Sequence, residues 1–199
     1  NMLINGDTLG ADTVIFDLED AVSPDEKDAA RILVRNALKY QNFSGCEVVV
    51  RINPTDTEFW KEDLDAVIPL KPDMIMPTKV SGGEMSREVS AYMGQVEERR
   101  GIEKGSVKIL PLIETALGVE KAYEIASSDV RVAGLFLGGE DFTADMHCKR
   151  TIEGQEIFYA RTRLFWAARA CGIEAYDTPF TDVEDMEGLR KDTEFAKSL

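Results

Sequence analysis

Histidine and cysteine are scarce in this 199-residue sequence. Its single histidine is His147, and its three cysteines are Cys46, Cys148 and Cys171. The cysteines are odd in number, far apart and without CxxC spacing, which argues against a disulfide framework and a zinc site. We therefore expect reduced thiols in a cytoplasmic protein.

Long hydrophobic runs and an excess of positive charge are also absent. No apolar run approaches the roughly 18 to 20 residues that a membrane span needs, and no signal peptide is visible. The 23 basic residues face 37 acidic ones, which gives a net charge of −14. Because this balance repels phosphates and anionic lipids, we expect neither nucleic acid nor a membrane as a partner.

Apolar runs of strand length alternate with amphipathic stretches of helical length along the whole chain. This alternation predicts an α/β protein with a parallel sheet, formed as one domain over residues 1–199. The predicted strands are 13–18, 47–52, 73–76, 107–113, 130–137 and 173–176. The predicted helices are 25–40, 58–70, 84–100, 116–127, 154–171 and 182–198. Ser23, Pro24 and Glu26 predict a capping box at the start of the first helix.

The number of units bears on the type of α/β fold. Six strand-and-helix units fill the chain, whereas a closed (β/α)8 barrel has eight units and about 250 residues. Residues 2–9 resemble the end of a helix that leads into the first strand. We therefore expect most of a TIM-type (β/α)8 barrel without its first and last strands, and the alternative is an open doubly wound parallel sheet.

Ionisable or polar side chains follow nearly every predicted strand. In parallel α/β folds the carboxyl ends of the strands meet on one face, where functional sites form. The alternative explanation is that chains simply emerge into water at these points. The side chains in question are Asp17, Glu19, Asp20, Arg51, Asn53, Lys79, Glu114, Glu140, Asp141 and Asp177.

Carboxylates without nearby histidine or thiol groups favour a hard cation held by oxygen atoms. Mg²⁺ fits best, because it takes one or two protein carboxylates and keeps water or substrate oxygens as its other ligands. His147 is better explained as a loop residue than as a ligand or base. Arg51 could bind a substrate carboxylate through two parallel hydrogen bonds, or it could form a structural ion pair with Asp17 or Glu19.

Several motifs, in order along nearly the whole chain, together resemble one enzyme family. They are FDLEDAV at 16–22 with Lys27 and AAR at 29–31, VRIN at 50–53, PLIET at 111–115, GGEDF at 138–142 and ARACGIEAYDTPFTD at 168–182. They resemble the citryl-, malyl- and citramalyl-CoA lyases of the HpcH/HpaI aldolase-like family, which are metal-dependent barrel enzymes. Within this family the chain is most similar to the citrate lyase beta chains.

The resemblance implies roles for individual residues. Glu114 and Asp141 match the two Mg²⁺ ligands, and Arg51 matches the residue that binds the keto-acid carboxylate. Glu19 and Asp20 match the pair that hydrogen-bonds water molecules on the metal and orients the site. Further matches are Gly138 and Gly139, where small residues let substrate approach the backbone, and Lys79, where the usual Pro-Lys sequence appears as Pro-Thr-Lys at 77–79.

The implied activity is Mg²⁺-dependent retro-Claisen cleavage of a citryl thioester, carried by CoA or an acyl carrier protein, to oxaloacetate and an acetyl thioester. The alternatives are a malyl- or citramalyl-CoA lyase, a thioesterase on the same site, or a non-catalytic structural or regulatory subunit. The resemblance further implies citrate lyase alpha and gamma (acyl carrier) chains as partners, and a homo-oligomer that is a trimer or a multiple of three.

Overall fold

The computed structural model describes residues 10–43 and 45–199, so the helix end predicted at residues 2–9 lies outside the described part. The chain divides into two compact units. The N-terminal unit comprises Asn1–Thr78 and Met85–Leu110, and the C-terminal unit comprises Lys79–Glu84 and Pro111–Leu199. None of the helices in the described part is long and apolar enough to cross a membrane.

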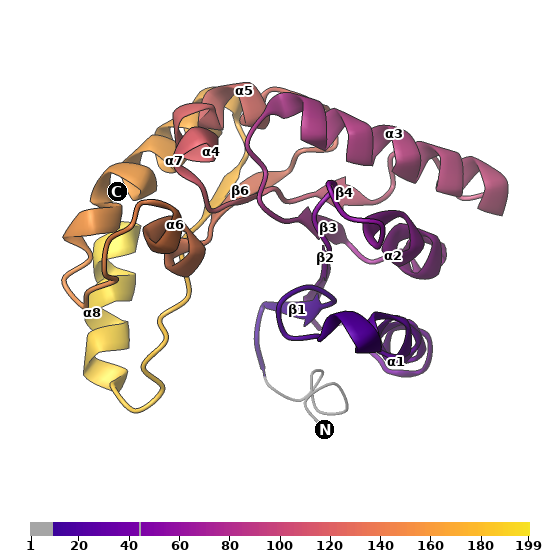
Figure 1. Ribbon diagram of the computed structural model, residues 1–199, viewed down its shortest axis with the longest axis horizontal. Helices are drawn as coiled ribbons and strands as arrows, with labels where there is room; N and C mark the ends of the chain where they lie inside the picture. Colours follow the sequence, from indigo (N-terminus) through magenta and orange to yellow (C-terminus); the bar gives the residue numbers. More distant parts are fainter. Residues whose placement is uncertain (1–9, 44) are drawn as a thin grey trace. The chain divides into compact units, whose positions relative to one another are not determined.

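The N-terminal unit contains a four-stranded parallel sheet. Its strands are β1 (Thr13–Asp17), β2 (Glu47–Ile52), β3 (Met74–Pro77) and β4 (Lys108–Ile109), in that spatial order. Helices α1 (Lys27–Tyr40) and α2 (Trp60–Val67) lie along one side of this sheet (Figure 1). Short 3-10 turns precede α1 at Pro24–Glu26 and follow α2 at Ile68–Leu70, and α3 (Gly83–Arg100) connects to β4.

Alternation along β2 separates the core from the face that carries charge. Val48, Val50 and Ile52 belong to the hydrophobic cluster that the helices cover. Because successive strand side chains point to opposite faces, Arg51 projects to the other side of the sheet. Asp17 on β1 is the register partner of Arg51, so both side chains lie on this same face.

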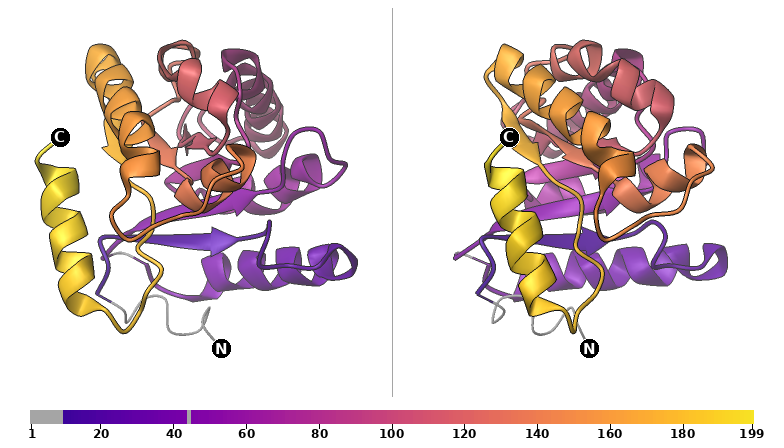
Figure 2. Two further views of the ribbon diagram at one scale, coloured as in Figure 1. Left: turned by 60° about the vertical axis from the view of Figure 1, so that its left-hand side comes forward. Right: turned by 90° about the vertical axis from the view of Figure 1, so that its left-hand side faces the viewer.

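The C-terminal unit contains a three-stranded parallel sheet with the order β5 (Leu112–Ile113), β6 (Gly134–Leu137) and β7 (Glu174–Tyr176). The remaining helices are α4 (Ala116–Glu120), α5 (Ala122–Ala126), α6 (Gly139–Asp145), α7 (Phe158–Cys171) and α8 (Met186–Lys197). A 3-10 turn at Gln155–Ile157 precedes α7. Helices α5 and α7 pack against each other and against β6 (Figure 2). The predicted α/β alternation is confirmed, and closure of a barrel stays a prediction.

The structure corrects several predicted elements. The single strand predicted at 107–113 is two strands in two sheets, β4 and β5. Leu110 donates its N–H to Ile75 of the first sheet, whereas Pro111 has no N–H and gives its carbonyl to Phe136 of the second. The helix predicted at 116–127 is interrupted into α4 and α5, and α6 was not predicted.

The capping box predicted at the first helix is wrong. Ser23 is the N-cap residue, but its side chain makes no capping hydrogen bond to any described residue. Its backbone carbonyl instead accepts the N–H of Glu26, which closes a 3-10 turn before α1 begins at Lys27.

A buried polar cluster joins α1, α2 and the end of β2. Asp63 is 1% exposed and accepts hydrogen bonds from Arg31 Nε at 2.9 Å, Asn53 N at 3.0 Å and Asn53 Nδ2 at 2.7 Å. The same Asn53 amide donates to the carbonyl of Leu18 at 3.0 Å. The cluster therefore fixes the chain that follows β1 relative to α2.

We predict that Asp63→Ala lowers the free energy of unfolding by about 3 to 5 kcal/mol, because it removes the buried acceptor of Arg31 Nε and of the Asn53 backbone and side-chain N–H groups. Asp28 also pairs with Arg31, at 2.7 Å, but its side chain is 87% exposed. Asp28→Ala is therefore the matched control and should cost less than about 1 kcal/mol. Urea denaturation monitored by circular dichroism measures both values, and equal losses would contradict the assignment.

Candidate functional site

The charged face of the N-terminal unit is organised by an ion pair between Arg51 and Asp17. Arg51 donates from Nε to Asp17 Oδ1 at 2.7 Å and from Nη2 to Asp17 Oδ2. Its Nη1 lies 3.3 Å from Glu19 Oε2. The structural ion pair considered as an alternative for Arg51 is therefore present, and substrate binding by Arg51 stays a prediction.

Glu19 lies in the turn after β1 and is held at several atoms. It is 3% exposed, its N–H donates to Asp17 Oδ1 at 2.8 Å, and its Oε2 accepts the N–H of Asp20 at 3.0 Å. The Asp20 side chain is exposed. The pair predicted from the sequence thus consists of one fixed, buried carboxylate and one that faces solvent.

Lys27 is a buried residue whose role was missed by sequence reasoning. Its Nζ donates to the carbonyls of Leu18 at 2.8 Å and Glu19 at 2.7 Å, so it fixes the backbone beneath the Glu19 carboxylate. The buried stripe of α1 is Lys27, Arg31, Val34 and Ala37. Two cations on the buried stripe of an amphipathic helix were the available signal, because charged residues are rarely buried unless they are paired.

The ionisation of Asp17 follows from these contacts. Burial opposes the charged form, but the hydrogen bonds from Arg51 and from the backbone of Glu19 and Ala21 outweigh it, and the pKa of Asp17 lies below its ordinary value. Burial likewise favours a lower pKa for Arg51, whereas Asp17, Glu19 and Asp20 raise it above the ordinary value. Both groups stay charged at neutral pH.

In the C-terminal unit, Glu114 directly follows β5 and is 3% exposed. Its Oε1 accepts the backbone N–H of Lys79 at 2.7 Å. Its Oε2 faces Gly138, where a Cβ atom would lie only 2.7 Å away. The Lys79 amide therefore fixes one oxygen of the carboxylate, and Gly138 supplies the space that the other occupies.

Asp141 lies in the first turn of α6, which begins directly after β6 and Gly138. Because Ile113 and Leu137 are register partners, Glu114 and Gly138 follow neighbouring strand ends. Asp145, at the end of α6, accepts the N–H of Ala116 at 2.8 Å and so ties α6 to the start of α4. Asp141 itself is half-buried.

The two neighbouring glycines have internal packing reasons to lack side chains. A Cβ at Gly139 would lie 2.6 Å from Thr178 Oγ1, and the Gly139 N–H donates to that oxygen at 2.9 Å. Gly138 is constrained by Glu114 in the same way. Close approach of substrate to these two residues stays a prediction.

Two further predicted positions are exposed. The Lys79 side chain faces solvent, and its backbone has a left-handed φ of 55°. His147 is also exposed and left-handed, in the loop after α6. This placement is the one expected for His147 as a loop residue, whereas a substrate contact by Lys79 stays a prediction.

The oxygen donors available fit a magnesium ion better than a transition metal. Within residues 10–43 and 45–199, no group of three or more His, Cys, Asp and Glu side chains is arranged to hold a metal ion. Mg²⁺ needs only one or two carboxylates, because water and substrate oxygens complete its six ligands. Glu114, buried and held with its oxygens fixed, has the properties of such a ligand.

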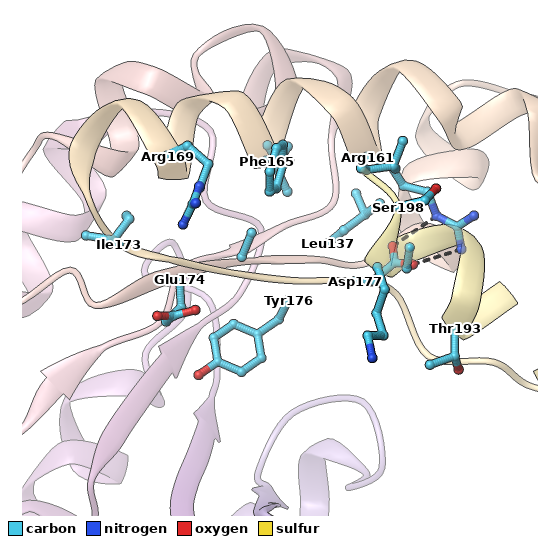
Figure 3. A pocket seen from close by; sticks show the side chains of 15 residues that line it. Leu137, Arg161, Phe165, Arg169, Ile173, Glu174, Tyr176, Asp177, Thr193 and Ser198 are labelled. Atoms are coloured by element: carbon cyan, nitrogen blue, oxygen red, sulfur yellow. Dashed lines mark hydrogen bonds and ion pairs between the residues drawn. The ribbon is translucent and has the colours of Figure 1, made fainter. Parts of the chain in front are cut away.

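A separate hollow of about 740 Å³ lies in the C-terminal unit between α7, β7 and α8 (Figure 3). Arg161 on α7 donates to Asp177 at 3.0 Å and to Asp192 on α8 at 2.8 Å. Asp177, which the sequence placed among the strand-end charges, therefore joins α7 to the end of β7. We assign this ion pair a structural role.

The whole chain is similar to proteins of one known family. Residues 1–199 match the family model described as HpcH/HpaI aldolase/citrate lyase. The chain is 42% identical over 198 residues to "Citrate lyase subunit beta" of Leuconostoc mesenteroides subsp. cremoris, which covers 100% of the chain and 66% of that protein. It is 33% identical to the "L-malyl-CoA/beta-methylmalyl-CoA lyase" of Cereibacter sphaeroides, over 90% of the chain and 63% of that protein.

A solved structure of the citrate lyase beta subunit from M. tuberculosis, complexed with oxaloacetate and magnesium, has the same fold. Its TM-score is 0.81 at 27% identity, with 99% of this chain and 82% of that chain covered. The present chain thus spans about two thirds of the length of the two curated relatives.

We predict that Asp17→Asn flattens the pH dependence of stability in acid. Because the pKa of Asp17 in the folded protein lies below its ordinary 3.8, its stabilising effect is present above that value and is lost as pH falls through the lowered pKa. Wild type should therefore lose stability more steeply than the variant below about pH 4.

Urea denaturation between pH 7 and pH 2.5 measures this dependence. Asp25→Asn, an exposed change in the turn before α1, should alter stability at pH 7 by less than about 0.5 kcal/mol. Parallel curves for wild type and Asp17→Asn would show that the ion pair does not stabilise the fold.

Proposed function

This chain belongs to the HpcH/HpaI aldolase/citrate lyase family, and from this premise we propose that it cleaves a citryl thioester, carried by CoA or an acyl carrier protein, to oxaloacetate and an acetyl thioester. The observation that carries the proposal is the 42% identity with citrate lyase subunit beta, which runs through the whole chain. The buried, oriented Glu114 carboxylate supports it from the geometry.

Glu114 and Asp141 are the proposed ligands of Mg²⁺. Both are carboxylates, and they follow neighbouring strands of one sheet, Glu114 after β5 and Asp141 after β6. When bound, Mg²⁺ would act as a Lewis acid that lowers the pKa of the substrate hydroxyl and stabilises the charge that develops on its oxygen. The protein holds Glu114 ready for this role, because the Lys79 amide is hydrogen-bonded to one carboxylate oxygen and Gly138 leaves space for the other.

Arg51 is proposed to bind the carboxylate of the keto acid. Asp17 occupies the Nε and Nη2 edge of the guanidinium, so the substrate would approach the edge formed by Nη1 and Nη2. Glu19 and Asp20 are proposed to orient water molecules around the ion, with Glu19 fixed through its N–H, carbonyl and carboxylate. These contacts hold charged groups in place before substrate arrives, which reduces the reorganisation needed during reaction.

Cleavage requires the hydroxyl proton to leave while the carbon–carbon bond breaks. The electron pair of that bond passes to the acetyl thioester as an enolate, which then takes up a proton. Lysine need not form a Schiff base in this chemistry, because the thioester itself stabilises the carbanion. Lys79 and Gly138–Gly139 are proposed to lie beside the substrate, and Lys79 would not act as a nucleophile.

A second candidate is a malyl- or citramalyl-CoA lyase, or a thioesterase acting at the same residues. The 33% identity with a malyl-CoA lyase favours keeping it. A non-catalytic subunit is the third alternative, but the presence together of Arg51, Glu114 and Asp141 argues against it. The family membership further supports a cytoplasmic homo-oligomer of three or a multiple of three, and alpha and acyl carrier chains as partners.

We predict Mg²⁺-dependent release of oxaloacetate from citryl-CoA, with slower turnover of malyl-CoA and citramalyl-CoA. Glu114→Gln and Asp141→Asn should each lower turnover at least about a hundredfold, because each removes an anionic metal ligand. Coupling oxaloacetate to NADH oxidation by malate dehydrogenase measures the rate with citryl-CoA, and lactate dehydrogenase does the same for the glyoxylate or pyruvate released from malyl-CoA or citramalyl-CoA.

Glu120→Gln and Glu140→Gln are the matched controls, since both carboxylates are exposed and close in sequence to the tested ones. They should retain activity within about threefold. Turnover like that of wild type in Glu114→Gln at limiting Mg²⁺ would contradict the ligand assignment. Preference for malyl-CoA would support the second candidate. Turnover that does not depend on Mg²⁺ would contradict the proposed role of the metal.

Arg51→Lys is expected to raise KM for the thioester about tenfold or more, with a smaller effect on kcat, since a lysine ammonium cannot reproduce two parallel hydrogen bonds to a carboxylate. Arg35→Lys, an exposed change on α1, is the control. Steady-state kinetics and oxaloacetate inhibition constants provide the measurement. An unchanged oxaloacetate affinity in Arg51→Lys would exclude Arg51 from substrate binding.

A further inference from the structure

Lys79 adopts a backbone conformation that residues with a side chain rarely adopt. Its φ is 55°, in the left-handed region, where the Cβ atom is crowded by the neighbouring carbonyl. Such conformations persist where the surroundings enforce them, and they gather at functional sites. At Lys79 the conformation directs the backbone N–H to Oε1 of Glu114, at 2.7 Å.

Contacts within the C-terminal unit hold the segment that follows Lys79. Val80 donates its N–H to the Leu112 carbonyl on β5 at 3.2 Å. Gly118 on α4 approaches the Val80 carbonyl so closely that a Cβ there would lie 2.5 Å from the oxygen. Gly83 donates to Glu124 Oε1 at 3.1 Å. The segment is therefore fastened to β5, which directly precedes Glu114, and to α4 and α5.

The Lys79 amide determines how Glu114 presents its second oxygen. With Oε1 hydrogen-bonded to the amide, rotation of the carboxylate would break that bond, and the missing side chain at Gly138 leaves the space that Oε2 occupies. Glu114 is 3% exposed, so bulk water cannot easily replace that bond. The orientation of a metal ligand is thus set by a main-chain group.

We propose that Lys79 is a positioning residue that acts through its left-handed backbone amide, which orients Glu114 for Mg²⁺, and that its side chain is dispensable for this role. The inference rests on the proposed function, because it takes Glu114 to be a metal ligand. It places the importance of position 79 in backbone conformation, where glycine is as suitable as lysine and β-branched residues are not.

Four substitutions separate the amide from the side chain. Lys79→Met removes the charge, and Lys79→Gly removes the whole side chain while favouring the left-handed conformation. Lys79→Val keeps the N–H but disfavours φ near 55°, and Lys79→Pro removes the N–H altogether. Mg²⁺ dissociation constants from titration calorimetry are the main measurement, and thermal unfolding with and without Mg²⁺ is the second.

The chain supplies a close control in Lys71. It is also an exposed lysine with a φ of 55°, but its N–H donates to the Ile68 carbonyl at the end of a 3-10 turn. Lys71→Val should therefore lower the melting temperature as much as Lys79→Val does, with an unchanged Mg²⁺ dissociation constant. If backbone strain alone weakened Mg²⁺ binding, Lys71→Val and Lys79→Val would both bind the ion more weakly.

We expect Lys79→Met and Lys79→Gly to bind Mg²⁺ within about threefold of wild type, and Lys79→Val to bind it about tenfold more weakly, as for other groups that orient metal ligands. Lys79→Pro should bind it more weakly still if circular dichroism shows that it folds. Wild-type affinity in Lys79→Val, or an equal loss in Lys79→Met and Lys79→Val, would overturn the proposal. A wild-type chain that binds no Mg²⁺ would overturn the proposed function and, with it, this inference. The wild-type titration alone reveals that outcome, before any variant is compared.

Discussion

A carboxylate removed from water must be compensated by hydrogen bonds or by positive charge, and the structure depends on how three buried or half-buried carboxylates meet this requirement. Asp17 receives Arg51 and two backbone N–H groups. Asp63 receives Arg31 and the Asn53 side chain. Glu114 accepts the backbone amide of Lys79 at one of its oxygens. Each of these carboxylates is thus held in place by hydrogen-bond donors, and Glu114 is the one that we propose as a metal ligand.

Much of the fold and part of the site could be predicted from the sequence, because strand-length apolar runs and the charges that follow them are local signals. Glu114, Arg51 and Glu19 indeed lie at or beyond strand ends. The division of the 107–113 run between two sheets was not predictable from hydrophobicity, since apart from Lys108 its residues are apolar on both sides of the break. The signal for that division was Pro111, which cannot donate a ladder hydrogen bond.

Other features could not be predicted because they depend on tertiary contacts. The partners of Lys27 are backbone carbonyls, which no residue pattern identifies, and Asp63 reads as an ordinary exposed helix residue until Arg31 and Asn53 surround it. The left-handed conformation of Lys79 has no sequence signal, since lysine is not a residue that favours it. The family motif marks Gly138 and Gly139, but the side chains that require their small size, Glu114 and Thr178, come from distant parts of the sequence.

The two interpretations of Arg51, structural ion pair and substrate ligand, are compatible because a guanidinium has more than one hydrogen-bonding edge. Asp17 occupies the edge formed by Nε and Nη2, and the pair fixes the plane of the group. The protein, and not the substrate, then sets the orientation of the edge formed by Nη1 and Nη2. On the proposed function, Asp17 therefore lowers the entropy cost of binding a carboxylate at Arg51, because the long side chain is already immobilised. Glu19, 3.3 Å from Nη1, adds negative charge at that edge and would favour a substrate that arrives with a dication over a free carboxylate.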